Sequence, residues 1–520
     1  MGTYLNPGNG GFAEILDTGY IDKTGMVKLI NRKINTLNKL VCISRPRRFG
    51  KSIAAKMLCA YYDHTCDSHS LFDDKAISFD ENYEKYLNKF NVIYLDMTNI
   101  LGKIKPEMLI DFIQESITNE LLAEYTNVKR GAAFDHTLIN TIEAGNPKFI
   151  MIIDEWDAPI RETPQIIKEY LRFLRMLFKS SNTTSKIFAA AYMTGILPIK
   201  KDGSESAISD FDEYSVLDAG EFAPYTGFTE DEVKRLSDEY GMDFSKAKQW
   251  YDGYTFGSVS SVYNPYSVMQ AMKRRAFKSY WRKTSTAESL KTYVSMNMDS
   301  LQEKILRLIA GETVEVYTDD FENDFETFNS SDDVLTLMIH LGYLVYDPET
   351  SQARIPNEEL RIEFNRLLNR PSNKKLSDLV KASEKLLQDT LNGNENAVSE
   401  TIARVRETNY APMYYNNEQA LRYVIKFAYI ICIDYYLKVE ELPTGKGIAD
   451  VVFVPKRDTS LPAMIVELKW NESSESAIAQ IKEKNYPSLL SEYSGEMVLV
   501  GVNYNVKTKE HSCKIENIEI

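Results

Sequence analysis

The stretch Leu40–Asp63, LVCISRPRRFGKSIAAKMLCAYYD, decides the fold of the first half of the chain. Its first five residues, LVCIS, form an apolar run that is typical of a buried strand. A basic loop, Arg45–Gly50, follows, and beyond it Ile53, Met57 and Tyr61 recur at helical spacing. A strand, a tight loop, Gly-Lys-Ser and a helix together are the layout of a phosphate-binding loop.

This layout predicts which groups bind a nucleotide. The backbone of Arg48, Phe49 and Gly50 and the helix N-terminus face an anion, Lys51 reaches the terminal phosphates, and Ser52 is a ligand of Mg²⁺. We therefore expect ATP and Mg²⁺ as cofactors. Arg45 stands where such loops usually have a glycine, five residues before Gly50. Arg45 fits there only with a negative φ, so the loop entry must differ from the common one. A basic loop that contains GKS by accident is the alternative.

The composition sets the class of protein. A chain of 520 residues is too long for one ordinary core, and its 43% hydrophobic and 26% charged residues are typical of a globular protein. No apolar run approaches the length of a membrane span, and the N-terminus lacks a signal-peptide pattern. The five cysteines show no CxxC pair, so we expect reduced thiols, no zinc site, no membrane and a cytoplasmic location.

The net charge of −14 argues against a protein that coats nucleic acid, but it leaves room for a local basic groove. One basic cluster surrounds the phosphate loop. A second cluster mixes cations with aromatic residues, as single-strand binders do: Lys273, Arg274, Arg275, Phe277, Lys278, Tyr280, Trp281, Arg282 and Lys283. A solvated helix with its aromatic residues in the core explains the same residues, and the sequence favours that interpretation.

A later strand supplies the second half of the nucleotide site. The segment 148–160, KFIMIIDEWDAPI, has an apolar run that ends in Asp154 and Glu155. Strands at 91–99 and 186–199 alternate with helical stretches, which predicts a mostly parallel sheet whose carboxyl ends share one edge. Asp154 would hold Mg²⁺ and Glu155 would be the catalytic group that polarises the attacking water. Thr194, where the fourth strand ends, either contacts the γ-phosphate or closes a turn.

The sequence alone leaves the roles of several other residues undecided. Asp22 and Lys23 either lie near the base or cap a helix. An arginine finger has four candidates, and a neighbouring subunit in a homo-oligomer is a further source; the four are Arg45, Arg47, Arg48 and Arg161. The segments WYDGYTFG and VYNPYSVMQAM are predicted to form packed loops with no chemical role.

The C-terminal 120 residues contain a second set of acids. A long amphipathic helix is predicted at 414–437, followed by two strands that form a hairpin. Asp450 starts the first strand, and Glu467 and Lys469 stand two apart on the second, so they face the same side. Two carboxylates and a lysine can hold a metal against a phosphodiester and position the attacking water, although Glu-x-Lys on an edge strand is also frequent by chance.

Further residues belong to this predicted metal-dependent phosphodiesterase site. Gln480 and Lys484 share one face of the next helix, four residues apart. We expect Glu418, in the first helix, to be the third metal ligand beside Asp450 and Glu467, and Glu440 and Glu441 are the alternatives. Mg²⁺ is expected here, with Mn²⁺ as a substitute. If no helix acid reaches the metal, the domain binds nucleic acid without cutting it.

RPRRFGKS, with YLNPGNGGF and YIDKTGM upstream, resembles the signature of a bacterial family of AAA-like ATPases that carry a C-terminal PD-(D/E)xK nuclease-like domain. The arrangement of Asp450, Glu467, Lys469 and Gln480 also resembles that nuclease class, and the resemblance implies that Gln480 supports the site or contacts DNA. The resemblance implies an α/β protein with a parallel-sheet P-loop ATPase domain at 1–285, a helical, winged-helix-like region at 286–400, and a nuclease-like domain at 401–520. It implies ATP hydrolysis coupled to a module that acts on nucleic acid, with DNA favoured. The alternatives are a switch or remodelling ATPase that binds without cutting, and a scaffold that binds nucleotide without hydrolysing it.

Overall fold

The computed structural model describes residues 2–179, 181–199, 210–281, 293, 296, 300–319, 321, 328, 330–368, 374–409, 417–443, 448–456, 461–484 and 496–519. The chain forms two compact units. The first comprises Met1–Tyr293 and Glu315–Leu360, and the second comprises Val294–Val314 and Arg361–Ile520. The middle region predicted at 286–400 is divided between them in this arrangement. Among these described residues, no helical segment combines the length and the hydrophobicity of a membrane span. All five cysteines are free.

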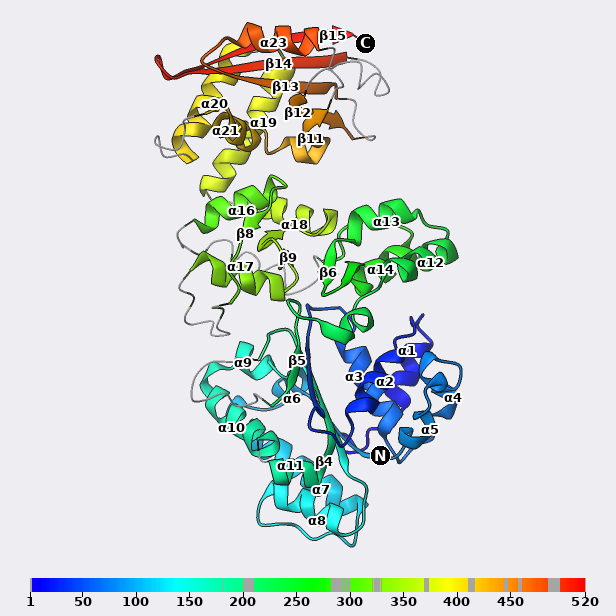
Figure 1. Ribbon diagram of the computed structural model, residues 1–520. Helices are drawn as coiled ribbons and strands as arrows, with labels where there is room; N and C mark the ends of the chain where they lie inside the picture. The colour runs from blue at the N-terminus through cyan, green and yellow to red at the C-terminus, as the bar shows by residue number, and fades with distance from the viewer. Residues whose placement is uncertain are drawn as a thin grey trace. The chain divides into compact units, whose positions relative to one another are not determined.

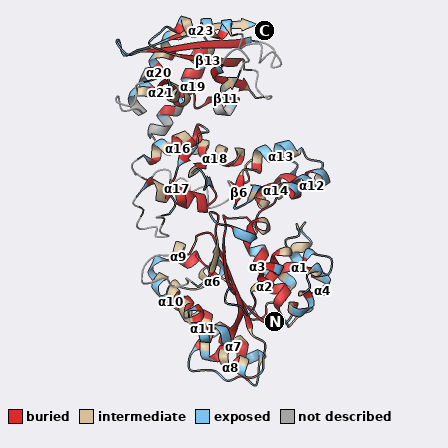
Figure 2. Ribbon diagram, viewed as in Figure 1, coloured by how far each residue is buried: buried red, intermediate tan, exposed pale blue. Residues whose placement is uncertain are grey.

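The first unit is built on a parallel sheet of five strands in the order β2-β3-β4-β1-β5. The strands are β1 (Leu40–Ser44), β2 (Asn91–Asp96), β3 (Phe149–Asp154), β4 (Phe188–Gly195) and β5 (Asp212–Tyr214). Four of them match the predicted apolar runs. Strands β1, β3 and β4 are buried along their whole length, because helices cover both faces of the sheet (Figure 2).

Helices pack on the two faces of this sheet in two separate cores (Figure 1). One face carries α1 (Gly10–Leu16), α2 (Gly25–Lys33), α3 (Lys51–Tyr62), α4 (His69–Phe72), η1 (Ala76–Phe79) and α5 (Tyr83–Tyr86). The other face carries α6 (Met97–Leu101), η2 (Pro106–Met108), α7 (Leu109–Glu124), α8 (Phe134–Glu143), α9 (Ala158–Glu162), η3 (Pro164–Ile166), α10 (Ile167–Phe178) and α11 (Ser181–Ile187). The faces of β1, β3 and β4 are therefore covered, and the candidate site residues lie at or just beyond strand ends.

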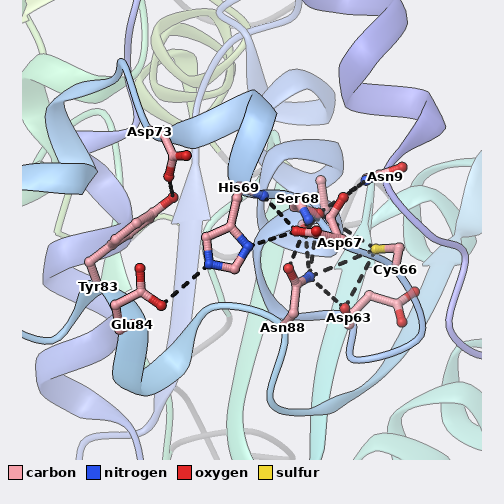
Figure 3. Close-up of polar contacts among 11 residues, drawn as sticks. Asn9, Asp63, Cys66, Asp67, Ser68, His69, Asp73, Tyr83, Glu84 and Asn88 are labelled. Atoms are coloured by element: carbon pink, nitrogen blue, oxygen red, sulfur yellow. Dashed lines mark hydrogen bonds and ion pairs between the residues drawn. The ribbon is translucent and has the colours of Figure 1, made fainter.

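A buried carboxylate holds the far end of α3 (Figure 3). The Asp63 side chain accepts hydrogen bonds from the Gly8 backbone at 2.6 Å and from the Thr65 backbone at 2.8 Å. Asn88 donates its side-chain amide to the Asp63 carbonyl at 2.6 Å and accepts from the Ser68 backbone at 2.9 Å. These bonds fasten α3 to the N-terminal segment that leads into α1.

The rest of the first unit is formed by η4 (Gly220–Tyr225), α12 (Glu230–Tyr240), α13 (Phe244–Tyr251), the hairpin β6 (Tyr254–Phe256) and β7 (Val259–Val262), α14 (Pro265–Arg274), α17 (Ser331–His340), β9 (Val345–Asp347) and β10 (Gln352–Arg354). Helix α17, the antiparallel pair β9–β10 and α18 (Glu358–Leu368) reproduce the predicted order of helix, strand, turn, strand and helix. That these elements form a winged helix remains a prediction. Tyr280 and Trp281 are buried, so these aromatic residues of the second basic cluster are core residues, while Arg282 and Lys283 lie outside the described residues.

The second unit has a five-stranded sheet in the order β11-β12-β13-β14-β15, antiparallel except for the pair β13–β14. Its strands are β11 (Tyr436–Pro443), β12 (Ile448–Pro455), β13 (Ala463–Trp470), β14 (Glu496–Asn505) and β15 (Glu510–Glu519). Its helices are α16 (Leu301–Ile309), α19 (Lys374–Leu391), α20 (Glu395–Asn409), α21 (Glu418–Ala428), α22 (Cys432–Tyr435) and α23 (Ser474–Glu483). The division between the units falls within β8 (Val314–Glu315) and α18.

The single helix predicted at 414–437 is wrong in its extent. Helix α21 ends at Ala428, α22 is a separate short helix, and the chain already enters β11 at Tyr436. Tertiary contacts replace the helical ones here: the Ile431 backbone donates to the Ser383 hydroxyl at 3.0 Å, and the Tyr429 and Thr390 hydroxyls bond at 2.7 Å. No glycine or proline signals this break in the sequence.

Candidate functional site

The loop between β1 and α3 has the backbone shape of an anion-binding site. Gly50 precedes α3 with a φ of 88°, and Arg48 has a φ of 71°, a left-handed conformation that is costly for a residue with a side chain. Left-handed residues separated by an ordinary one give the concave row of backbone N–H groups that binds phosphate. The Phe49 ring is buried against Tyr254 and Phe256, which holds the loop in place.

Lys51 points into this loop. Its ammonium group donates to the carbonyls of Arg45 and Pro46, both at 3.1 Å, and lies 3.7 Å from the Glu155 carboxylate. The side chain is 3% exposed, so the charge is neutralised by these oxygens and not by water. An entering phosphate would offer stronger, charged acceptors in the same place.

Strands β2, β3 and β4 bring polar side chains to one edge. Asp96, Asp154 and Thr194 stand side by side in register. Asp154 is 2% exposed, and its Oδ1 has no hydrogen-bond partner within the described structure. Burial raises the pKa of Asp154 to about 6, the charge of Glu155 adds to this rise, and a hydrogen bond with Ser52 opposes it. A buried carboxylate oxygen without a partner, beside a serine hydroxyl, fits a hard divalent cation such as Mg²⁺.

Glu155 is held in a strained backbone conformation, with a φ of 53°. Its carboxylate forms an ion pair with Arg161 at 2.9 Å, and the same guanidinium binds the buried Asp157 at 2.9 Å. Thr194, by contrast, has a fully buried hydroxyl with no partner in the described structure. A cavity of about 660 Å³ opens onto this edge and is lined by Arg47, Arg48, Ser52, Asp96, Thr98, Asn99, Asp154, Glu155, Arg161 and Glu162. It offers space for a terminal phosphate and a water.

A second cavity, of about 410 Å³, also borders the loop. Gly50, Lys51 and Ser52 form its polar end. The remaining wall is largely apolar and includes Ile15, Tyr20, Ile21, Ile53, Met57, Tyr225, Phe228, Pro265, Tyr266 and Met269. Ile53 is 40% exposed, although it is apolar, because it faces this cavity. An apolar pocket that ends in a phosphate loop fits a nucleoside triphosphate, with its base among the apolar side chains.

The structure distinguishes among the residues of the first unit whose roles the sequence left undecided. The φ of Arg45 is not positive, as expected for a residue with a side chain at this position of the loop. It is fully buried and donates to the Thr226 hydroxyl at 2.9 Å and to the Tyr214 carbonyl at 2.7 Å, so it fastens the loop and is excluded as an arginine finger. Asp22 accepts from the backbone of Thr24 and of Ala76, both at 2.8 Å, which is a structural role. Lys23 lines the cavity, but its ammonium group is paired with Glu232 at 2.7 Å.

In the second unit, the predicted acids converge. The Asp450 Oδ2 accepts from the Leu468 backbone at 2.9 Å, and the Asp450 backbone donates to Glu467 at 3.5 Å. Lys469 donates to the Gln480 carbonyl at 2.7 Å, and the Gln480 amide donates to Glu467. The four side chains therefore form one connected patch on β12, β13 and α23.

Close packing of α23 on the sheet positions Gln480. Gly501 of β14 pairs in register with Glu467, and a methyl group at Gly501 would lie 2.3 Å from the Ser474 carbonyl and 3.0 Å from the Ala477 methyl. Only glycine leaves room for the helix at this distance. The spacing of Gln480 along α23 then brings its amide over the Glu467 carboxylate.

Helix α21 contributes two charged side chains. Glu418 lies close enough to Asp450 that the Asp450 charge, after burial, raises the pKa of Glu418. Four residues later, Arg422 forms an ion pair with the Asp450 Oδ1. Both Asp450 oxygens are thus engaged, and Arg422 is a site residue that the sequence analysis missed. The side chains of the rival acids Glu440 and Glu441 lie outside the described residues.

The charges of this patch are balanced without a metal. Burial, and then the charge of Asp450, raise the pKa of Glu467 to about 8, so this carboxyl group is mostly protonated at neutral pH. Within the described ranges, no three His, Cys, Asp or Glu side chains gather closely enough to hold a metal ion. The oxygen donors Asp450 and Glu467 fit Mg²⁺ or Mn²⁺ once Arg422 releases Asp450.

The sequence analysis also missed part of the nucleotide cavity. It assigned VYNPYSVMQAM to packing alone, whereas Pro265, Tyr266, Met269 and Gln270 of this segment line the cavity. Arg48 stacks on the Tyr266 ring, with the guanidinium carbon 3.8 Å from the ring centre. The four-residue spacing of Tyr266 and Gln270 on a helix was visible, but nothing in it indicates which face meets a ligand.

Comparison with known proteins gives a family match in each of the two parts of the chain that carry these residues. A family model described as predicted AAA-ATPase matches residues 8–204, and a model of the PD-(D/E)XK nuclease superfamily matches residues 416–513. A protein of Azotobacter chroococcum mcd 1, named uncharacterized protein in vnfD 5'region, is 25% identical over 370 residues, which cover 68% of this chain and 66% of that protein. The chain thus spans just under two thirds of that relative.

Two solved structures also align with the chain. One is the ORC2 protein of Aeropyrum pernix, with ADPNP and ADP, at 13% identity and a TM-score of 0.31, covering 69% of this chain and 97% of that one. The other is Cdc6p of Pyrobaculum aerophilum, at 12% identity and a TM-score of 0.25, covering 65% and 88%. At this level of similarity neither structure supports a conclusion about this chain. The two family matches confirm the expected architecture: the chain combines an AAA-ATPase-like domain with a domain of the PD-(D/E)XK nuclease superfamily.

Proposed function

We propose that this protein hydrolyses ATP and uses a metal-dependent C-terminal site to cleave phosphodiester bonds in nucleic acid, with DNA as the favoured substrate. One observation carries the proposal: the chain places Asp154 beside Ser52 in one unit, and Asp450, Glu467, Lys469 and Gln480 in a single connected patch in the other. Each constellation has the residues that its chemistry needs.

In the ATPase unit, the loop backbone at 48–50 binds the phosphates, and Lys51 turns from the loop carbonyls towards them. Ser52 and Asp154 would hold Mg²⁺, which supplies neutralisation of phosphate charge. Glu155 orients the attacking water after it separates from Arg161, whose guanidinium lies 2.9 Å away. Thr194, buried with an unpaired hydroxyl at the same edge, then serves as the polar contact between that water and the γ-phosphate.

In the nuclease unit, Asp450 and Glu467, with Glu418 nearby, would hold the divalent cation that supplies stabilisation of phosphorane charge. Lys469 positions or deprotonates the attacking water, and Gln480 fixes Lys469 through the 2.7 Å hydrogen bond. Arg422 leaves Asp450 when the cation enters, and its guanidinium is then available to a phosphate oxygen of the substrate.

The test is a matrix of variants and substrates. Wild type, Lys51→Ala, Glu155→Gln, Asp450→Ala and Lys469→Ala are each incubated with single-stranded and duplex DNA and RNA, with Mg²⁺ or Mn²⁺, with and without ATP. We expect Lys51→Ala and Glu155→Gln to abolish phosphate release, and Asp450→Ala and Lys469→Ala to abolish cleavage. Cleavage that persists in Asp450→Ala and Lys469→Ala would reject the nuclease site, and ATP turnover that persists in Lys51→Ala would reject the ATPase site.

A second function has one observation in its favour. Arg422 occupies the Asp450 Oδ1, and the described residues hold no cluster of three potential metal ligands. A C-terminal domain in this state would bind nucleic acid and not cut it, which makes the protein a nucleotide-driven switch or remodelling ATPase. This function predicts ATP turnover and nucleic-acid affinity that survive Glu467→Ala, with no cleavage by wild type.

A further inference from the structure

Helix α10 has an apolar face and a charged face. Its apolar side is buried in the core that also contains residues of α7 and α8, and consists of Tyr170, Phe173, Leu174, Leu177 and Phe178. The opposite side faces solvent, and a cavity of about 470 Å³ lies along it. In the described part of the chain, Lys168 and Arg172 on this side are therefore accessible to a partner.

A stripe of four cations follows this exposed side. The stripe consists of Lys168, Arg172, Arg175 and Lys179, at spacings of four, three and four residues. At 100° per residue these side chains fall within an arc of about 60°, and they extend over about 16 Å of the helix axis. Lys168, Arg172 and Lys179 are exposed and Arg175 is half-buried. The cavity is lined by Lys168, Leu171, Arg172, Arg175 and Met176.

The exposed charges of Lys168 and Arg172 do not stabilise the helix that carries them. Cations three and four residues apart on a helix repel one another, so the arrangement disfavours the helix that carries it. Of the ion pairs among the described residues, none includes Lys168 or Arg172, while neighbouring cations such as Arg161 and Lys186 do pair with acids. A ligand that carries regularly spaced negative charges would remove this repulsion, and a nucleic-acid backbone is such a ligand.

Helix α10 is also bonded to the segment that follows β3. The Tyr170 hydroxyl donates to the Trp156 carbonyl at 2.8 Å, and both side chains are buried. Trp156 directly follows Glu155, and its backbone donates to the Thr194 carbonyl at 3.0 Å. A shift of α10 therefore moves the backbone that sets the strained conformation of Glu155.

We propose that the stripe on α10 binds the phosphate backbone of nucleic acid, and that the Tyr170–Trp156 hydrogen bond transmits this contact to Glu155, so that nucleic acid stimulates ATP hydrolysis. The proposal rests on the proposed function. It adds a binding surface on the ATPase unit, apart from the nuclease site, and a route by which the polymer controls the nucleotide site. The contact is independent of base sequence, because it involves phosphates alone.

The experiment compares Lys168→Glu/Arg172→Glu with the control Lys103→Glu/Lys105→Glu. Lys103 and Lys105 are exposed in the same unit, and the change in charge is the same. Binding of labelled DNA is measured by fluorescence anisotropy over a series of KCl concentrations, with EDTA to prevent cleavage. We expect the first variant to bind more than tenfold more weakly, with a salt slope smaller by about 2, whereas the control behaves as wild type.

ATP turnover with Mg²⁺, with and without DNA, tests the transmission. We expect stimulation to be lost in Lys168→Glu/Arg172→Glu and basal turnover to be kept. Tyr170→Phe keeps the ring and removes the hydroxyl, so it should bind DNA normally but lose stimulation. Affinity for a fluorescent ATP analogue shows that each variant is folded.

The outcomes separate this proposal from the function on which it rests. A wild type that is stimulated by DNA, with the charge-reversal variant binding and responding equally, overturns the surface alone. Normal stimulation in Tyr170→Phe overturns the transmission. Binding of anionic phospholipid vesicles without binding of DNA overturns the choice of partner. A wild type that neither hydrolyses ATP nor binds nucleic acid overturns the proposed function itself.

Discussion

Glu467→Gln should make the metal-free protein more stable while it removes a metal ligand. Glu467 is 2% exposed, and burial with the nearby Asp450 charge raises the pKa of Glu467 from 4.5 to about 8. In the folded chain the group therefore keeps its proton up to about pH 8, whereas the unfolded chain releases it near pH 4.5. The unfolded state binds fewer protons in this window, so the free energy of unfolding falls as the pH rises from 4.5 to 8.

The size of the effect follows from the shift. A difference of about 3.5 pKa units corresponds to about 5 kcal/mol above pH 8, and about 3 kcal/mol of this is already lost at pH 7. Glutamine has the shape of the protonated acid and no charge, so Glu467→Gln escapes this loss. For a unit of this size, about 3 kcal/mol corresponds to a rise in Tm of about 6–12 °C.

The assay is thermal unfolding in EDTA between pH 4.5 and 8, followed by calorimetry because the two units can unfold separately. We expect the gain in Tm of Glu467→Gln over wild type to grow across this range. Glu483→Gln, an exposed change of the same charge on α23, should show no such gain. Added Mn²⁺ should raise the Tm of wild type and leave that of Glu467→Gln unchanged, because binding to the folded state alone stabilises it. A pH profile of Glu467→Gln parallel to that of wild type would refute the reasoning.

Four further outcomes follow from other contacts. Arg422→Met should destabilise the metal-free second unit by about 3 kcal/mol, because the buried Asp450 carboxylate loses its counter-ion. It should also increase the gain in Tm on addition of Mn²⁺, and a smaller gain would contradict competition between Arg422 and the cation for Asp450. Gly501→Ala should destabilise the same unit by about 1–3 kcal/mol in urea unfolding, since α23 must move; full stability would show that α23 adapts. Tyr266→Ala should weaken binding of a fluorescent ATP analogue about threefold to tenfold, and unchanged affinity would place the base elsewhere. Burial lowers the pKa of His340 to about 4, so the first unit should lose about 3 kcal/mol as the pH falls from 6.5 to 4, and His340→Gln should flatten this fall in acid unfolding.

The predictable part of both sites has a common physical basis. Buried parallel strands are continuous apolar runs that end at one edge, so Asp154 and Thr194 could be placed together from sequence alone. The alternation of side chains along a strand likewise put Glu467 and Lys469 on one face. Both inferences need only the two-residue alternation of side chains along a strand and the common direction of parallel strands.

The missed residues depend on contacts between distant segments. Tyr266 reaches the nucleotide cavity only because α14 packs beside the phosphate loop, about 215 residues away along the chain. Arg422 meets Asp450 because α21 packs against the sheet at β13, beside the strand that carries Asp450. The early end of α21 likewise depends on distant contacts, the bonds of Tyr429 and Ile431 to α19. No local pattern encodes either contact.

In both units an arginine neutralises an acid to which the proposed function gives a catalytic or metal-binding role. Arg161 binds Glu155 in the first unit, and Arg422 binds Asp450 in the second. Buried carboxylates arranged for a cation or a phosphate repel one another when that ligand is absent, and a nearby guanidinium removes this cost. The same guanidinium must then leave before the acid can act, so each site gains stability at rest and depends on its ligand for activation. Substrate binding, and not the mere presence of the acids, would then decide when either site is active.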